Sequence, residues 1–85
     1  MKNVNFSTYL IAYNITDFYE VRAVSYLDAI TEFARYVGED VPLVVKALRA
    51  MDTVEERIAL FNKLSFQTID TIYLISEKKS LKKEG

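Results

Sequence analysis

The sequence predicts an α+β fold, a single two-layer domain in which three helices cover one face of a three-stranded antiparallel sheet. Two observations carry this prediction. Residues 17–40 read as a strand that runs directly into a capped amphipathic helix. Two more helical segments follow, and the chain then enters a second stretch rich in β-formers, so the predicted order of elements is ββαααβ.

Length and composition fit one small globular domain. The chain has 85 residues, of which 51% are hydrophobic, with six tyrosines and five phenylalanines. Only two glycines and one proline interrupt this apolar sequence, which is typical of a compact domain and not of a disordered chain. We expect one globular domain over residues 1–76 and a basic, frayed tail over residues 77–85.

The charge is unevenly distributed between these two parts. Residues 1–76 hold seven Lys and Arg against ten Asp and Glu, whereas residues 77–85 hold four Lys against two Glu. A slightly acidic domain argues against a surface for duplex DNA, which needs a basic stripe. The tail either adds weak attraction to nucleic acid or acidic membranes, or serves only as a solubilising end.

The first two segments predict a β-hairpin. Residues 5–13 are rich in β-formers and apolar on both faces, which is typical of a central strand. Residues 14–17 supply turn chemistry, and residues 18–24 alternate apolar and polar side chains. The second strand is therefore expected to be half solvated.

The first helix is the clearest element in the sequence. Ser25 is a good N-cap, and Asp28 three residues later forms a weaker version of a capping box. Apolar residues fill one half of the helix that follows, and Gly38 is the natural residue to end it.

The second helix is unusually apolar. Asp40 or Val41 caps it, Pro42 fits its first turn, and it runs to about Met51. Only two basic residues mark a solvent side. Such a helix is either sandwiched inside the domain or contributes to an interface.

The third helix leads into the last strand. Thr53 and Glu56 have the spacing of a capping box for a helix over residues 53–64, and residues 66–76 form a strand, most clearly from Thr71 onward. Three alternating helices return the chain antiparallel to the first strand. The predicted sheet order is therefore 2-1-3.

Catalysis finds little support in the residue types present. The chain has no cysteine and no histidine, which excludes disulfides, thiolate zinc sites and the commonest general base. The serines and threonines have no paired base at a recognisable spacing. We expect no catalytic residue, no metal ligand and no cofactor.

The sequence shows no signal for a membrane. No basic segment followed by an apolar run stands at the N-terminus, and no apolar stretch approaches the roughly 20 residues of a membrane span. We expect a cytoplasmic protein.

A set of acidic residues at the helix starts is the first candidate site. If they converge, they could bind a cation or imitate nucleic-acid phosphates for a basic partner; the alternative is that they only cap helices. This acidic patch comprises Glu39, Asp40, Asp52, Glu55 and Glu56.

The helices over residues 42–51 and 53–64, joined by a short turn, have the layout of a helix-turn-helix. Glu55 and Glu56 in the first turn of the second helix would face phosphate, which disfavours base reading there. Nucleic acid is therefore not expected as the main partner.

Aromatic residues on the strands form the second candidate site. On an open sheet face they could stack on single-stranded bases, anchor a protein interface, or be ordinary half-exposed tyrosines. Arg57 lies inside an apolar helix face. It either snorkels past Phe61 or pairs with an acid at the rim of the core, or else it anchors an interface. The full candidate interface comprises Tyr9, Tyr13, Phe18, Val45, Arg49, Arg57 and Tyr73.

These features favour a small non-enzymatic protein that binds another protein stoichiometrically. A second copy of the same chain, in a homodimer, is the other partner that these features allow. Its size and type are those of regulators or inhibitors carried by phages and mobile elements, for example proteins that block a host nuclease. The alternatives are a nucleic-acid-associated protein that uses the strand aromatics and the basic tail, and a structural subunit of a homo-oligomer.

Overall fold

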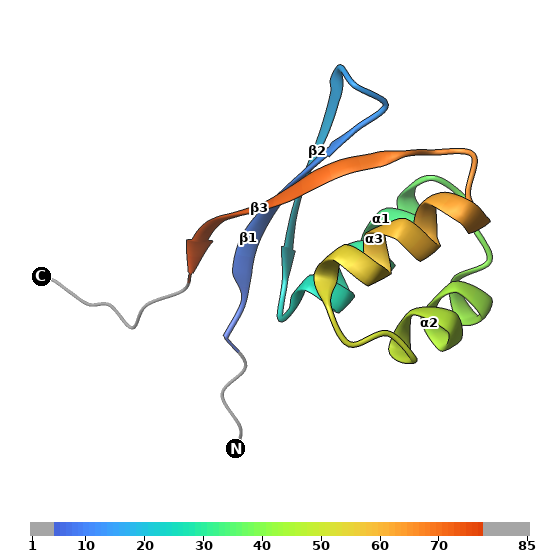
Figure 1. The fold of residues 1–85 in the computed structure, drawn as a ribbon. Coiled ribbons are helices and arrows are strands. Elements are labelled where there is room, and N and C mark those ends of the chain that lie inside the picture. The colour runs from blue at the N-terminus through green and yellow to red at the C-terminus, as the bar shows by residue number, and fades with distance from the viewer. Residues whose placement is uncertain (1–4, 78–85) are drawn as a thin grey trace, which may run out of the picture.

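The computed structural model describes residues 5–77 and confirms the predicted order of elements. Three strands and three helices follow one another as ββαααβ (Figure 1). They are β1 (Ser7–Tyr13), β2 (Asp17–Ala23), α1 (Tyr26–Tyr36), α2 (Val41–Arg49), α3 (Val54–Leu64) and β3 (Ile69–Glu77). Of the predicted tail, Glu77 belongs to β3, and residues 78–85 lie outside the described residues.

The sheet has the predicted order, β2-β1-β3, with both pairs antiparallel. Ile11 in the central strand lies opposite Tyr19 on one side and Ile72 on the other. Because directly opposite residues point to the same face, the odd-numbered residues of β1 define the inner face. The pairing of β1 with β3 is irregular near both ends of β1.

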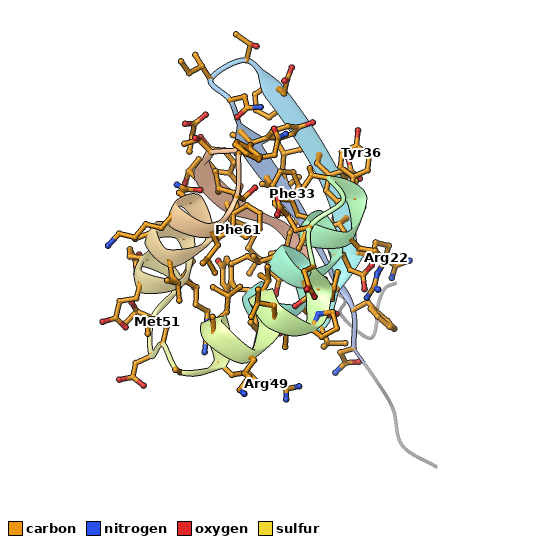
Figure 2. The ribbon with its side chains drawn as sticks, turned by 90° about the vertical axis from the view of Figure 1, so that its right-hand side faces the viewer. Arg22, Phe33, Tyr36, Arg49, Met51 and Phe61 are labelled. Atoms are coloured by element: carbon orange, nitrogen blue, oxygen red, sulfur yellow. The ribbon has the colours of Figure 1, made fainter. Side chains whose placement is uncertain are left out.

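All three helices lie on one side of the sheet, so the domain has two layers (Figure 1). Phe33 of α1 sits at the centre of the core between the layers (Figure 2). Its ring centroid is 4.7 Å from that of Tyr13 and 5.6 Å from that of Phe61. Aromatic contacts of this kind join β1, α1 and α3 into one core.

The predicted limits of α1 are confirmed. The hydroxyl oxygen of Ser25 accepts a hydrogen bond from the backbone N–H of Asp28 at 3.0 Å. The carboxylate of Asp28 accepts one from the N–H of Val24, also at 3.0 Å. Gly38 follows the helix with a φ of +85°, a conformation that glycine adopts without steric penalty.

Helix α2 is capped by Asp40 and ends at Arg49, slightly earlier than expected. It packs against α1 and α3 with Val44 and Leu48 buried, while Leu43 is exposed. The helix is therefore sandwiched along one side and open to solvent along the other.

Helix α3 begins with the predicted capping box. The carboxylate of Glu56 accepts hydrogen bonds from the N–H groups of Asp52 and Thr53, at 3.0 and 3.1 Å. The hydroxyl of Thr53 accepts one from the N–H of Glu56 at 3.1 Å.

The start of β3 differs from the prediction, because the strand begins at Ile69 and residues 65–68 form a loop. The side-chain amide of Asn62 donates to the carbonyl of Ile69 and accepts from its N–H, at 3.0 and 2.8 Å. These two bonds fix the position of Ile69 against α3. Phe66, expected in the strand, is fully exposed in the loop.

The tip of the hairpin is fastened to the start of β3. Asn14 donates its backbone N–H to the carbonyl of Thr68 at 2.8 Å, and Ile15 donates to the Asp70 carboxylate at 2.7 Å. Both Asn14 and Ile15 have positive φ values, +50° and +73°.

Candidate functional site

The open face is the side of the sheet turned away from the helices, and no element within residues 5–77 covers it (Figure 1). The pairing register assigns its members, because Phe18 lies opposite Ala12 and Tyr73 opposite Leu10. The side chains that the register assigns are Thr8, Leu10 and Ala12 from β1, Phe18, Glu20 and Arg22 from β2, and Thr71 and Tyr73 from β3. Ile75 follows in the irregular part of the pairing with β1.

Large apolar side chains dominate the exposed part of this face. Phe18 is 62% exposed and Tyr73 is 52% exposed. Leu10 lies half-buried in the central strand next to Tyr73. Such side chains on two different edge strands of one face are typical of an interaction surface.

Charged groups border the face along β2. Glu20 and Arg22 alternate with apolar inner residues and are both exposed. The guanidinium of Arg22 lies 5.9 Å from the centre of the Phe6 ring, within the range of a cation–π contact. The face therefore has an apolar centre and one border of mixed charge.

The structure divides the predicted strand aromatics between the two faces. Phe18 and Tyr73 lie on the open face, as just described. Tyr9 is only 4% exposed and packs against Tyr26 with ring centroids 4.9 Å apart. Tyr13 lies against Phe33 on the same inner face. Tyr9 is therefore a core residue, and Tyr13 is partly buried against the core.

The pKa values of two tyrosines on the inner face, Tyr13 and Tyr19, are raised. Burial above all raises the pKa of Tyr13 above its usual value of 10.0, and a hydrogen bond with Tyr36 adds to the effect. Burial likewise raises the pKa of Tyr19, with a smaller contribution from the Glu32 carboxylate. Both phenols stay protonated at neutral pH and act as packing groups.

The predicted interface residues of α2 lie in the helical layer, away from the open face. Val45 is half-buried and lines a shallow hollow with Leu27 and Thr31 of α1. Arg49 borders the same hollow and is exposed (Figure 2). The predicted interface set does not form one surface.

Arg57 closes the end of α2. Its Nε donates to the carbonyl of Leu48 at 3.2 Å, and a terminal nitrogen donates to the carbonyl of Met51 at 2.9 Å. In place of an acid, Arg57 donates to two backbone carbonyls at the end of α2, and the Leu48 carbonyl also accepts from the N–H of Met51 at 3.0 Å. Arg57 acts as a structural link between α2 and α3.

The acidic patch does not converge. Asp40 begins α2, and Glu56 begins α3 near the other end of α2, which is about 13 Å long for nine residues. Both of these carboxylates accept backbone N–H groups as caps.

The other acids of the patch are similarly dispersed. The carboxylate of Glu39 accepts a hydrogen bond from the Ser65 hydroxyl at 2.6 Å. Asp52 and Glu55 are exposed. Within residues 5–77 no group of three or more acidic side chains could hold a metal ion.

Sequence reasoning missed several exposed apolar residues. Leu10 belongs to the open face, and its position opposite Tyr73 could have indicated this once Tyr73 was placed outward. Ile75 is exposed at the irregular end of the pairing between β1 and β3. Phe66 and Ile15 are exposed near the hairpin tip, where their neighbours Gln67 and Asn14 are hydrogen bonded. No pattern in the sequence marks these two as exposed.

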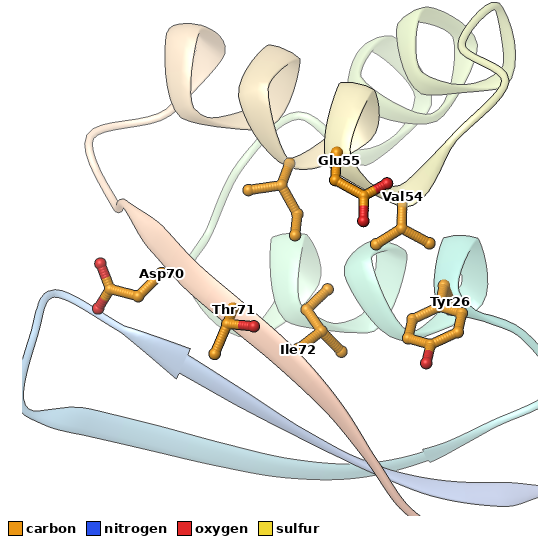
Figure 3. Close-up of a pocket in the computed structure, with 7 residues that line it drawn as sticks. Tyr26, Val54, Glu55, Asp70, Thr71 and Ile72 are labelled. Atoms are coloured by element: carbon orange, nitrogen blue, oxygen red, sulfur yellow. The ribbon is translucent and has the colours of Figure 1, made fainter.

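A groove of about 380 Å³ runs between α3 and β3, beside the free edge of β3 (Figure 3). Its apolar wall is formed by Val54 and Ile58 of α3 and Ile72 of β3. Tyr26 lies at one end, and Glu55 overhangs it from α3 (Figure 3).

No protein family, curated protein or solved structure was found to match this chain. Among the described residues, no helix is long and apolar enough to cross a membrane.

Proposed function

We propose that this protein acts by binding another protein stoichiometrically through the open face, without chemistry of its own. The observation that carries the proposal is the exposure of Phe18 and Tyr73 on the uncovered side of the sheet. Aromatic side chains in this setting are typical anchors of protein interfaces.

The dimensions of the open face fit an amphipathic helix of the other protein. Three strands are about 14 Å wide, and seven strand residues are about 23 Å long. A helix of roughly 15 residues has this length and is about 10–12 Å wide. An apolar stripe on such a helix covers Phe18, Leu10 and Tyr73.

The charged border defines the polar groups that the bound helix must carry. Glu20 and Arg22 lie two residues apart on β2. A carboxylate of the bound helix faces Arg22 and a basic side chain faces Glu20. Such pairs mainly set the orientation of the helix, whereas the apolar anchors supply most of the affinity.

Charge favours a protein over nucleic acid on this surface. Arg22 is accompanied on the open face by Glu20, and Asp17 and Asp70 lie at the end of the sheet near the hairpin tip. A surface for single-stranded nucleic acid joins its aromatics to a basic groove. The mixed charge here supports a protein surface instead.

The biological class of the proposed activity is regulation or inhibition in the cytoplasm. The small single domain and one dominant surface support a protein that blocks its target by occupying it. We place it among the accessory proteins of phages and mobile elements, with a host enzyme such as a nuclease as the kind of target.

Affinity capture with paired variants tests the proposal. Phe18→Lys adds a charge to the open face, and Leu43→Lys makes the same change at a 58% exposed site on α2. Each full-length protein serves as bait in extracts of the cells that produce it. We expect one protein to be retained by the wild type and by Leu43→Lys and lost with Phe18→Lys. Light scattering of the two purified proteins should then show an equimolar complex.

Two results would overturn the proposal. The first is that every captured protein binds the wild type and Phe18→Lys equally well. The second is that a labelled single-stranded oligonucleotide binds the wild type, weakens steeply with salt and loses binding with Phe18→Lys.

A further inference from the structure

We infer that the free edge of β3 is a pairing site for a second copy of this chain, so that two sheets join into one of six strands. The two copies pair β3 to β3 in antiparallel fashion. This inference concerns a different surface from the open face and does not depend on what the open face binds.

The first observation is that the middle of the β3 edge carries no charge. From Thr71 to Ser76 the strand has no charged residue and no proline, and its two charged residues, Asp70 and Glu77, stand near its ends. The opposite edge strand, β2, carries Glu20 at its centre as well as Asp17 and Arg22. Charged side chains are a common device against edge-to-edge pairing, and the middle of β3 lacks them.

The second observation is that Leu74 of one copy fits the groove between α3 and β3 of the other copy. Leu74 lies opposite Tyr9 and so points to the helical side, yet it remains 37% exposed. The groove beside Ile72 and Ile58 is open along the same edge (Figure 3). Leu74 lies outside the groove of its own copy. In a symmetric pair, Leu74 of each copy can fill the groove of the other copy.

The register of the pair follows from the faces of the strand. Directly opposite residues share a face. In a symmetric antiparallel pair, one residue of β3 must therefore lie directly opposite the same residue of the second copy, and the two-fold axis lies midway between them. Centring the pair on Tyr73 places Leu74 of the second copy opposite Ile72, next to the groove. Centring it on Ile72 places the leucine opposite Asp70 instead, and centring it on Leu74 leaves the groove empty.

The antiparallel direction follows from the position of Leu74 on the helical side. Antiparallel pairing keeps the helical sides of both copies on the same side of the joined sheet, so Leu74 of one copy faces the groove of the other.

The two-fold axis of such a pair stands perpendicular to the sheet. Both sets of helices therefore lie on one side, and the two open faces form one continuous surface on the other. The pairing removes less than the roughly 800 Å² per copy of a standard interface, so we expect a dimer that forms at about micromolar concentration.

Cysteine cross-linking tests the register directly, because the chain has no cysteine of its own. Tyr73→Cys places the two thiols opposite each other at a Cα separation of about 4.5–5.5 Å, within the range that a disulfide spans. Phe18→Cys, on the same face but the other edge strand, is the matched control. In a glutathione redox buffer at about 50 µM protein, we expect Tyr73→Cys to become mostly covalent dimer and Phe18→Cys to stay mostly monomer. Equal cross-linking of the two variants would overturn the inference.

A second variant keeps the test independent of oxidation. Leu74→Lys points a charge toward the helical side of the edge strand, and Leu43→Lys is its control on α2. Light scattering should give twice the 9.8 kDa chain mass for the wild type and for Leu43→Lys, and the chain mass for Leu74→Lys. Circular dichroism should show the same fold for all three. A wild type that stays at 9.8 kDa at about 100 µM, or a folded Leu74→Lys that still dimerises, contradicts the inference.

Discussion

Ile15 shows how a single residue can be held in an unfavourable conformation at the surface. Its φ of +73° lies in the left-handed region, which is a clear outlier for a β-branched residue. Its backbone N–H donates to Asp70, and the adjacent Asn14 is hydrogen bonded to the loop before β3. The hairpin tip is therefore held in place by β3 rather than by the preference of Ile15 itself.

Replacing Ile15 with glycine should relieve this strain. The side chain is exposed, so little packing is lost, and Asn-Gly is a favoured pair for two successive residues with positive φ. We expect Ile15→Gly to raise the free energy of unfolding by about 1 kcal/mol in urea denaturation. Thr16→Gly, at a neighbouring turn residue that does not have a positive φ, should lower it by about 0.5–1 kcal/mol. Equal destabilisation by both changes would show that Ile15 is not strained.

Glu56 links stability to pH at the start of α3. The backbone N–H of Asp52, and then that of Thr53, hold the pKa of the Glu56 carboxyl below its usual value of 4.5. A lowered pKa in the folded state gives stability that is present above 4.5 and is lost as the pH falls through the lower folded value. We expect the wild type to lose stability on acidification more steeply than Glu56→Gln.

The control for this change is Glu55→Gln, at an exposed neighbour that makes neither of these hydrogen bonds. Thermal unfolding followed from about pH 6 to pH 3 gives the slopes. Identical slopes for the wild type and Glu56→Gln would mean that the capping box does not contribute through its charge.

At the scale of the helices, the helix starts could be predicted from the sequence where the stabilising contacts join residues close together in the chain. Ser25 and Thr53 cap their helices through residues three positions later, so the sequence contains both partners of each bond. The start of β3 depends instead on Asn62 reaching Ile69 across the loop, a contact that no periodicity reports. The partners of Arg57 were likewise not predictable, because they are backbone carbonyls in α2 and just after it.

Arg57 should matter for the coupling of α2 to α3. Arg57→Met keeps most of the length of the side chain but removes the side-chain donor to the Met51 carbonyl and one of the donors to the Leu48 carbonyl. We expect the free energy of unfolding to fall by about 2 kcal/mol, with faster amide exchange at the end of α2. The exposed Arg49→Met is the matched control and should change stability by less than about 0.5 kcal/mol. Equal effects of the two changes on the free energy of unfolding would contradict the structural role assigned to Arg57.

At the scale of the whole molecule, the fold was predictable and the functional surface only in part. The order of elements and the sheet order follow from turn residues, caps and the return of the chain through three helices. The side chains of the open face do not follow, because β1 is apolar on both faces and its sequence fits either orientation. Only the register separates Tyr9, which is buried, from Leu10 on the open face.

Hydroxyl-radical footprinting of the full chain, alone and bound to the captured protein, tests the central claim that the open face is the binding surface. Phe18 reports on the open face far from the β3 edge, Tyr73 reports on the face next to that edge, and Tyr36 is a 59% exposed control on α1. We predict that labelling of Phe18 and Tyr73 falls at least about fivefold on binding, as for anchors at the centre of an interface. Labelling of Tyr36 should stay constant. Unchanged labelling of Phe18 in a stable complex would contradict the claim.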